Sequence, residues 1–269
     1  MNPQAAEPLI EFGQLKLSFG SHCLYDDLSL RVHRGETLTI LGASGSGKSV
    51  MLKLLIGLIK PDAGSIRFDG QELVPLSEKQ LLPVRRRISM LFQGGALFDS
   101  LTVGENIAYP IREHLRLSES EVAARVAQKL ELVGLPGIEQ MPPAELSGGM
   151  RKRVAIARAI AADPEVILYD EPTTGLDPIN TRRINELILS IQRSFRVTSL
   201  VVTHDLASAF MVSDRLAMLS ERRILATLPR EEFHRSQEAA IRSFVAAMPT
   251  AQPMPEGTMT ASFGQGALP

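Results

Sequence analysis

One segment near the N-terminus has the residue types and spacing that bind the phosphates of a nucleotide. It matches the pattern G-x-x-x-x-G-K-[ST] with Gly42, Ala43, Ser44, Gly45, Ser46, Gly47, Lys48 and Ser49. The glycines let successive N–H groups point at an anion, and the N-terminus of the following helix adds a partial positive charge. We expect Lys48 to reach the β- and γ-phosphates and the Ser49 hydroxyl to ligate Mg²⁺. The pattern indicates a nucleotide, and the chain has no N-K-x-D or T-K-x-D element to read guanine.

Two acids follow an apolar segment in the second half of the chain. Asp170 and Glu171 come directly after residues 166–169, which are predicted to form a buried strand. Ligands bind at the carboxyl edge of an open α/β sheet, so we expect Asp170 to hold Mg²⁺, directly or through water. Glu171 is expected to point in a different direction and to polarise the attacking water. The alternative is that both acids only cap the next helix.

Two further polar residues stand at the ends of predicted strands. His204 follows the apolar residues 199–203. With Lys48 and Glu171 at neighbouring strand ends, we interpret His204 as a contact of the γ-phosphate and not as a structural histidine. Gln93 follows residues 88–92, and its amide is a candidate contact of the metal or the water. Taken alone, the position of Gln93 does not choose between these roles and a structural one.

A second pair of glycines opens another predicted helix. Leu146-Ser147-Gly148-Gly149-Met150 precedes a helix predicted over residues 151–161. A helix N-terminus of this kind is another anion site, although the chain has a single phosphate loop. The combination favours a sandwich, in which the second site of each subunit closes on the nucleotide of another subunit.

The elements that must position these residues alternate between strands and helices. Strands are predicted over residues 9–12, 15–19, 28–32 and 37–41, and a helix over 49–58. Two buried strands, 166–169 and 199–203, flank a helix whose apolar face carries Ile184, Leu187, Ile188, Ile191 and Phe195. This order implies parallel strands with right-handed crossovers in an α/β fold. A terminal hairpin is predicted over 215–219 and 223–228.

Composition narrows the class of protein. Of 269 residues, 44% are hydrophobic and 22% are charged, which suits a buried core. The 29 basic and 30 acidic residues give a net charge of −1, which argues against a nucleic-acid binder. The one cysteine, Cys23, can form no intramolecular disulfide and favours a reducing compartment. We find no signal peptide and no uninterrupted run of ~18 apolar residues. We therefore predict a soluble protein that reaches a membrane through a partner.

In their order and spacing, these motifs resemble the nucleotide-binding subunit of an ABC transporter. The resemblance runs from about residue 9 to 228 and rests on the phosphate loop, Gln93, L-S-G-G, Asp170-Glu171, Gly175-Leu176-Asp177 and His204. It implies a P-loop NTPase (ABC ATPase) core with an antiparallel β subdomain and a helical subdomain over about 94–162. The ABC ATPase domain would cover 1–248 and end in a helix over about 231–248, which packs on its own domain or contacts a neighbouring subunit. We expect 249–269 to be a disordered tail.

The resemblance also implies roles for individual residues in a head-to-tail homodimer that holds ATP between its subunits. ATP would be bound by Phe19, which stacks on adenine, by residues 42–49 and by Val50. The other subunit would contribute Ser147, Gly148, Gly149 and Asp177. Mg²⁺ would be held by Ser49, Gln93 and Asp170, and the catalytic residues would be Lys48, Gln93, Glu171 and His204. Phe19 replaces the tyrosine of the family, and Met150 replaces its usual glutamine and is assigned no role.

One stretch points to a particular group of transporters. Residues 91–98, 101–103 and 109–114 are similar to the ATPases of Mla/Mce-type lipid transporters. This resemblance implies phospholipid transport between inner and outer membranes, with a multispanning inner-membrane permease, Mce-type lipid-binding subunits and accessory subunits as partners. The chain would then lie on the cytoplasmic face of the bacterial inner membrane.

The alternatives to a lipid transporter are an ABC transporter of a small solute, a non-transport ABC ATPase and a kinase. The second usually has long coiled insertions or two ATPase domains, and the third lacks L-S-G-G. Neither description fits this chain.

The triplet Arg85-Arg86-Arg87 either attracts acidic lipid headgroups or lies in a solvated loop.

Overall fold

A computed structural model describes residues 7–246 of the chain, and residues 1–6 and 247–269 lie outside the described part. The tail predicted over 249–269 and the end of the helix predicted over 231–248 therefore fall outside the described residues. Within 7–246, no helix combines the length and the hydropathy needed to cross a bilayer.

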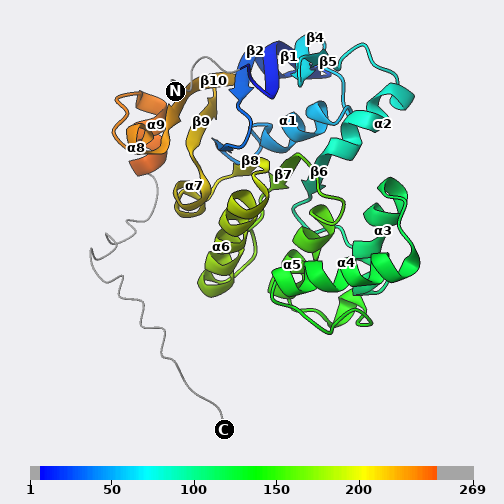
Figure 1. Cartoon of the computed structure of the whole chain (residues 1–269). Helices are drawn as coiled ribbons and strands as arrows, with labels where there is room; N and C mark the ends of the chain where they lie inside the picture. Colours follow the sequence, from blue (N-terminus) through cyan, green and yellow to red (C-terminus); the bar gives the residue numbers. More distant parts are fainter. Residues whose placement is uncertain (1–6, 247–269) are drawn as a thin grey trace.

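The strands form two sheets, as predicted (Figure 1). An antiparallel sheet has the order β2-β1-β4-β5 and contains β1 (Ile10–Phe19), β2 (His22–Val32), β4 (Ala63–Phe68) and β5 (Gln71–Glu72). The central sheet has the order β10-β9-β3-β8-β7-β6. Its strands are β3 (Thr37–Leu41), β6 (Ile88–Leu91), β7 (Val166–Asp170), β8 (Thr198–Thr203), β9 (Arg215–Ser220) and β10 (Arg223–Pro229). All neighbours in the central sheet are parallel except β9 and β10. The predicted parallel strands are confirmed.

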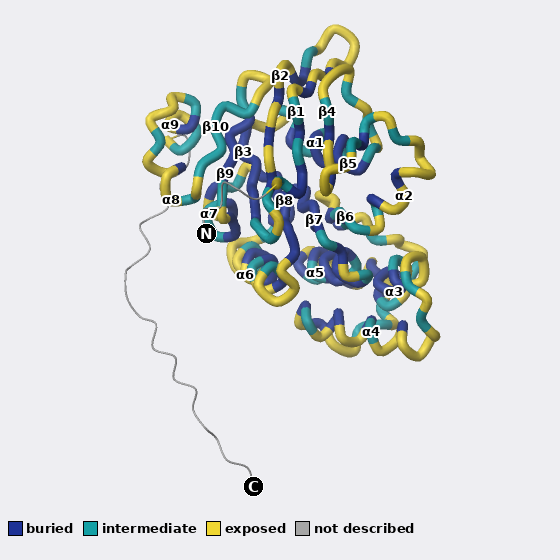
Figure 2. Tube along the Cα trace, turned by 45° about the horizontal axis from the view of Figure 1, so that its top comes forward, coloured by how far each residue is buried: buried dark blue, intermediate teal, exposed yellow. Residues whose placement is uncertain are grey.

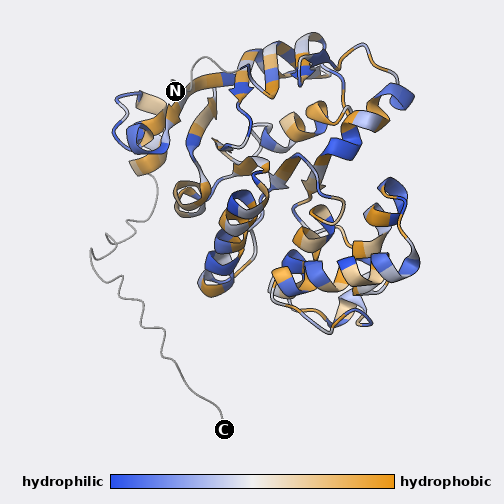
Figure 3. Cartoon of the chain, in the orientation of Figure 1, coloured by the Kyte–Doolittle hydropathy of each residue, from blue (hydrophilic) through white to orange (hydrophobic). Residues whose placement is uncertain are grey.

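Helices cover both faces of the central sheet, which explains why β3, β7 and β8 are buried along their whole length (Figure 2). On one face, α1 (Lys48–Leu55) shares a hydrophobic core with both sheets. On the other face, α5 (Gly148–Ala159) and α6 (Pro178–Phe195) pack against β7 and β8. The buried side of α6 carries Ile184, Leu187, Ile188 and Ile191, as predicted. The prediction is wrong for Phe195, which is 41% exposed at the end of the helix. Most of the remaining positions of α6 are hydrophilic (Figure 3).

A group of helices lies beyond strand β6 (Figure 1). It contains α3 (Val103–His114), α4 (Glu119–Leu132), a 3-10 turn at Pro143–Glu145, and α5. Helices α3 and α4 both begin with a capping box, in which Thr102 pairs with Glu105 and Ser118 pairs with Glu121. The group falls within the helical subdomain predicted over about 94–162. Helix α7 (Leu206–Val212) follows β8.

Two predicted elements differ from the structure. The strands predicted over 9–12 and 15–19 form the single strand β1, whose register shifts between Phe12 and Leu15, where Gln14 has a φ of 49°. Two short helices, α8 (Arg230–Phe233) and α9 (Ala239–Ala246), stand where the sequence predicts one. Between them the Ser236 hydroxyl accepts a hydrogen bond from the Glu238 N–H at 3.2 Å, and such local bonds compete with a continuous helix.

The basic triplet ends helix α2 (Glu78–Arg87), so the interpretation of a solvated loop is wrong. Arg85 donates to the Ile56 carbonyl and to Glu78, both at 2.7 Å. Arg87 pairs with Glu165 at 2.6 Å and with Asp69 at 2.5 Å. Because Asp69 follows β4 and Glu165 precedes β7, these ion pairs tie the antiparallel sheet to the central one.

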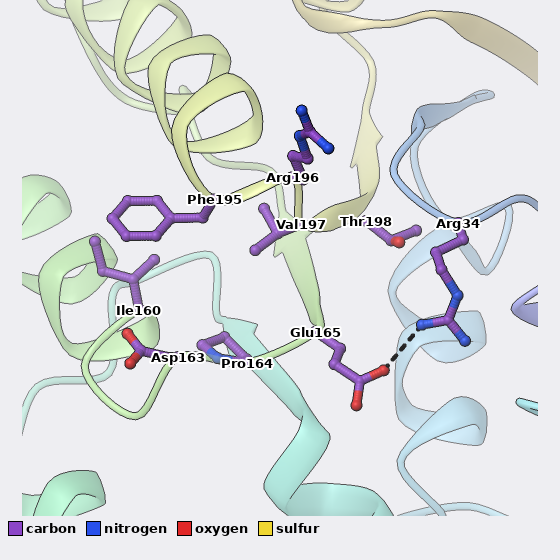
Figure 4. A pocket seen from close by; sticks show the side chains of 9 residues that line it. All are labelled: Arg34, Ile160, Asp163, Pro164, Glu165, Phe195, Arg196, Val197 and Thr198. Carbon is purple, nitrogen blue, oxygen red and sulfur yellow. Dashed lines mark hydrogen bonds and ion pairs between the residues drawn. The ribbon is translucent and has the colours of Figure 1, made fainter.

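A cavity of about 290 Å³ lies at the amino ends of β7 and β8. Figure 4 shows Arg34 paired with Glu165 at its rim and the Phe195 ring at the other side. None of the residues predicted to bind ATP lines this cavity. The candidate site must lie at the opposite ends of these strands, where Asp170 and His204 stand.

Candidate nucleotide-binding site

The phosphate loop connects the carboxyl end of β3 to the first turn of α1, as the sequence predicts. Gly47 precedes the helix with a φ of 102°, a backbone conformation that favours glycine. A Cβ atom at Gly47 would lie 2.9 Å from the Tyr25 hydroxyl oxygen and 3.0 Å from Leu24. At Gly42 a Cβ atom would lie 2.6 Å from the Leu219 carbonyl. Both glycines are therefore required by the packing behind the loop.

A buried tyrosine supports this loop from beneath. The Tyr25 hydroxyl donates a hydrogen bond to the Gly47 carbonyl at 2.6 Å, and the side chain is fully buried. Burial raises the pKa of Tyr25 well above its usual range, so the hydroxyl stays a donor. Sequence reasoning missed Tyr25, because a tyrosine in a strand carries no signal that separates a loop support from a core residue.

Lys48 is buried at the base of the loop. Its ammonium donates to the carbonyls of Gly42 at 2.9 Å and Ala43 at 3.0 Å, and lies 4.0 Å from Glu171 Oε1. Burial lowers the pKa of Lys48, and the carboxylates of Glu171 and Asp170 oppose this shift. An ammonium in such a position can exchange its carbonyl partners for phosphate oxygens.

Ser49 and Asp170 supply two oxygen ligands of the kind that Mg²⁺ prefers. The Ser49 hydroxyl donates to Asp170 Oδ1 at 2.6 Å, so a strand end and a helix start place both oxygens side by side. Burial raises the pKa of Asp170, against the hydrogen bond from Ser49. A hydroxyl and a carboxylate at the edge of a phosphate site fit a magnesium ion that also binds phosphate oxygens.

Glu171 is held by three side chains. Its Oε2 accepts from the hydroxyls of Thr174 and Thr203, both at 3.1 Å, and the His204 Nδ1 lies 3.0 Å from each carboxylate oxygen. The Glu171 backbone has a φ of 48°, which turns the chain away from the line of β7. Because Oε2 is engaged by two hydroxyls, Oε1 is the oxygen that faces Lys48. Thr174 and Thr203 were not singled out from the sequence.

Most of the predicted ATP residues of one subunit line a common cavity of about 440 Å³. They are Phe19, Ser44, Gly45, Gly47, Lys48, Ser49, Val50, Gln93, Glu171 and His204, joined by His22 and Leu24, which the sequence did not indicate. Gly42, Ala43, Ser46 and Asp170 are not among the lining residues. The structure therefore brings together segments from four strand ends of the central sheet and from β1 and β2 of the antiparallel sheet.

The residues predicted to act in trans lie apart from this cavity. Ser147 caps α5 by accepting from the Met150 N–H at 3.2 Å, and Asp177 caps α6 by accepting from Ile179 and Asn180 at 3.0 Å. A Cβ atom on Gly149 would lie 2.8 Å from the Asn180 side chain. The two caps are thus neighbours, and both are exposed.

Comparison with known proteins defines the class of this protein. The model of the ABC transporter family matches residues 25–174. The chain belongs to the ABC transporter family and is an ATP-binding, ATP-hydrolysing subunit.

Two individual relatives have names that specify a transport system. The chain is 42% identical to the intermembrane phospholipid transport system ATP-binding protein MlaF of Haemophilus influenzae over 237 residues, or 88% of this chain and 90% of that protein. It is 44% identical to the probable ribonucleotide transport ATP-binding protein mkl of Mycobacterium leprae over 236 residues, or 88% of this chain and 68% of that protein.

A solved structure of a dimeric ATP-binding cassette in a post-hydrolysis state, bound to ADP and phosphate, has a TM-score of 0.76. It is 30% identical, and the match covers 82% of this chain and 98% of that one. The α/β ATPase fold predicted from the motifs is confirmed.

Proposed function

We propose that this chain powers phospholipid transport between the inner and outer membranes of a bacterium. The observation that carries the proposal is the 42% identity to a phospholipid transport ATPase over 90% of that protein's length. The chain would bind a multispanning permease at the cytoplasmic face of the inner membrane, together with Mce-type lipid-binding and accessory subunits. It would have no nucleic-acid partner.

Within one subunit, we assign the chemistry of hydrolysis to a small set of side chains. Lys48 binds the β- and γ-phosphates, and Phe19 stacks on adenine. Glu171 Oε1 polarises the attacking water, since Oε2 is occupied by Thr174 and Thr203. His204 contacts the γ-phosphate and holds the Glu171 carboxylate. When bound by Ser49, Asp170 and Gln93, Mg²⁺ would neutralise charge on the phosphates.

We infer that the site is completed by a second copy of the chain. Ser147, Gly148, Gly149 and Asp177 would close on the ATP held by the partner's phosphate loop. The exposure of both helix caps supports this, and so does the dimeric form of the related cassette. Since helix N-termini favour anions, the cap at Ser147 suits the γ-phosphate of the partner's ATP.

A groove between β6 and helices α3 and α5 supports the permease as a partner. It has a volume of about 400 Å³ and is lined by Ser89, Met90, Phe92, Ala96, Phe98, Tyr109, Pro110, Arg158 and Ala159. The exposed fractions of Phe92, Phe98 and Tyr109 are 36%, 44% and 48%, and the Phe98 and Tyr109 rings are 5.2 Å apart. Exposed aromatic clusters of this kind mark protein contacts. A helix that presents apolar residues from the cytoplasmic side of a permease would fill the groove.

The groove is tested by two substitutions. Tyr109→Asp should reduce capture of the permease by the tagged chain, whereas ATP binding by the isolated chain should stay normal. Phe195→Ser, at an aromatic residue 41% exposed at the end of α6, is the control and should leave capture unchanged. Normal capture with Tyr109→Asp would remove the groove from the permease interface.

Ribonucleotide transport is the second candidate for the cargo, since the mycobacterial relative carries that name. The tagged chain should be captured from its native membranes and its partners identified by mass spectrometry. The captured complex, placed in donor liposomes, should transfer labelled phospholipid to acceptor vesicles only with ATP. Recovery with a sugar or amino-acid permease, or ribonucleotide uptake without lipid transfer, would overturn the phospholipid proposal.

A further inference from the structure

Helix α5 contains a buried cation that the roles assigned so far do not use. Lys152 lies one turn beyond the N-terminus of the helix, and its exposed fraction is 6%. Its ammonium donates to the main-chain carbonyl of Gln93 and, at 3.3 Å, to that of Glu171. One side chain therefore reaches the main chains of two residues that we assign to hydrolysis.

The burial of this ammonium is costly, and its partners are unusual. A buried charge is normally paired with an opposite charge. Among residues 7–246, no carboxylate forms an ion pair with Lys152. Nor does any backbone hydrogen bond within this part of the chain join Gln93 to Glu171. Lys152 is thus the direct polar link between the loop after β6 and the end of β7.

The next residues of the loop after β6, 94–96, also lie along helix α5. A Cβ atom on Gly95 would lie 3.4 Å from the Ala155 Cβ, which shows how closely the loop lies against the helix. Arg158 then donates to the carbonyls of Gly95 at 2.9 Å and Ala96 at 2.8 Å. Lys152 and Arg158 thereby hold residues 93–96 along the helix that begins at Ser147.

We propose that Lys152 is a positioning residue that sets the main chains of Gln93 and Glu171 relative to helix α5. This inference rests on the roles proposed above for Gln93, Glu171 and Ser147. Helix α5 starts at the cap that faces the partner's ATP, whereas Gln93 and Glu171 serve the ATP of their own subunit. Lys152 therefore transmits the position of one ATP site to the hydrolysis residues of the other.

The test compares two buried lysines in the full-length chain. Lys152→Met removes both carbonyl contacts with little change in volume. Lys129→Met is the matched control, because Lys129 is 3% exposed and pairs with Asp163 at 2.8 Å, away from the ATP cavity. Turnover at saturating MgATP, KM for ATP and the denaturation midpoint are measured for both. Misplaced catalytic groups cost up to about a hundredfold in rate, and we expect Lys152→Met to lower kcat at least tenfold with KM within about twofold.

Three further results are expected if Lys152 acts by positioning. Lys129→Met should lose stability but keep kcat at temperatures where it is folded. Lys152→Arg, which keeps a charged donor, should recover most of the lost rate. Lys152→Met combined with Glu171→Gln should still form the ATP-bound dimer, because the sandwich itself does not need Lys152.

Several outcomes would overturn the proposal. They are a normal kcat in Lys152→Met, an equal loss of kcat in Lys129→Met, and loss of the ATP-bound dimer in the double variant. If Lys152→Met does not fold, Lys152→Gln replaces it, since its neutral amide is one bond too short to span both carbonyls. A normal kcat in Lys152→Gln would also overturn the proposal. Full activity of Glu171→Gln alone would instead contradict the role in hydrolysis that we assign to Glu171 under the proposed function.

Discussion

The proposed ATP sandwich has two halves, which are the phosphate loop with its neighbouring acids and the caps of α5 and α6. One chain builds the first half more completely than the second. At the phosphate loop, Lys48, Asp170 and Glu171 are 6%, 6% and 8% exposed, and each has protein partners for its charge. At the caps of α5 and α6, Ser147 and Asp177 are exposed, and their partners are N–H groups of their own first turn and the Asn180 amide.

This difference has a physical reason. Buried charges need fixed partners, so the phosphate-loop half must be built before ATP arrives. An exposed helix N-terminus is solvated by water until an anion replaces it. In the proposed sandwich, the first half can therefore bind nucleotide within one chain, whereas the second half would gain its ligand only from another copy. Substitutions on the two sides should separate binding from dimerisation.

The largest effect is expected from Glu171→Gln. The substitution keeps the shape of the side chain but removes the charge that polarises water, so turnover should fall about 10²- to 10⁴-fold. ATP binding should persist, and an ATP-bound dimer should accumulate. Phosphate release and size-exclusion chromatography with MgATP measure these two properties. Normal steady-state hydrolysis would remove Glu171 from the mechanism.

Lys48→Ala should weaken the binding of ATP. Loss of a hydrogen-bonding charge costs about 1.5–3 kcal/mol, which corresponds to a loss of ATP affinity of about 10- to 150-fold. Turnover at subsaturating ATP should fall by about the same factor. Titration with a fluorescent ATP analogue checks the affinity, and an unchanged affinity and rate would refute the assigned role.

Ser147→Arg should act only on the second half. The added side chain would occupy the space of the partner's γ-phosphate, so the ATP-dependent dimer should be lost and turnover should fall about tenfold, or roughly 1.4 kcal/mol. Folding and ATP binding by the monomer should be normal. Ser120→Arg, at an exposed serine in α4, is the control. If Ser147→Arg still dimerises with ATP, the two halves do not meet as proposed.

Tyr25→Phe should produce the smallest change. It removes the one hydroxyl that holds the Gly47 carbonyl and leaves the ring in place. A single hydrogen bond of this kind is worth about 1 kcal/mol, so unfolding stability should fall by that amount and KM for ATP should rise about fivefold. Thermal denaturation and the ATP dependence of the rate measure both. An unchanged KM would make Tyr25 a core residue without influence on the loop.

Residues that are close in sequence were predictable, because local patterns suffice to place them. The phosphate loop joins a strand to a helix, and Asp170-Glu171 ends a buried strand, as the apolar run before it indicates. The parallel arrangement of β3, β7 and β8 follows from the order of strands and helices. The roles of these residues and the bounds of the subdomains stay predictions.

Contacts between distant segments could not be obtained in this way. Tyr25 reaches Gly47 across 22 positions, and Lys152 reaches Gln93 across 59. Their side chains have the same types as ordinary core or surface residues, and their partners are main-chain carbonyls, which every residue carries. Only the packing of β2 beneath the phosphate loop, and of α5 against the loop after β6, selects those carbonyls as partners. Periodicity and motif spacing hold no information about that choice, since they describe neighbours along the chain.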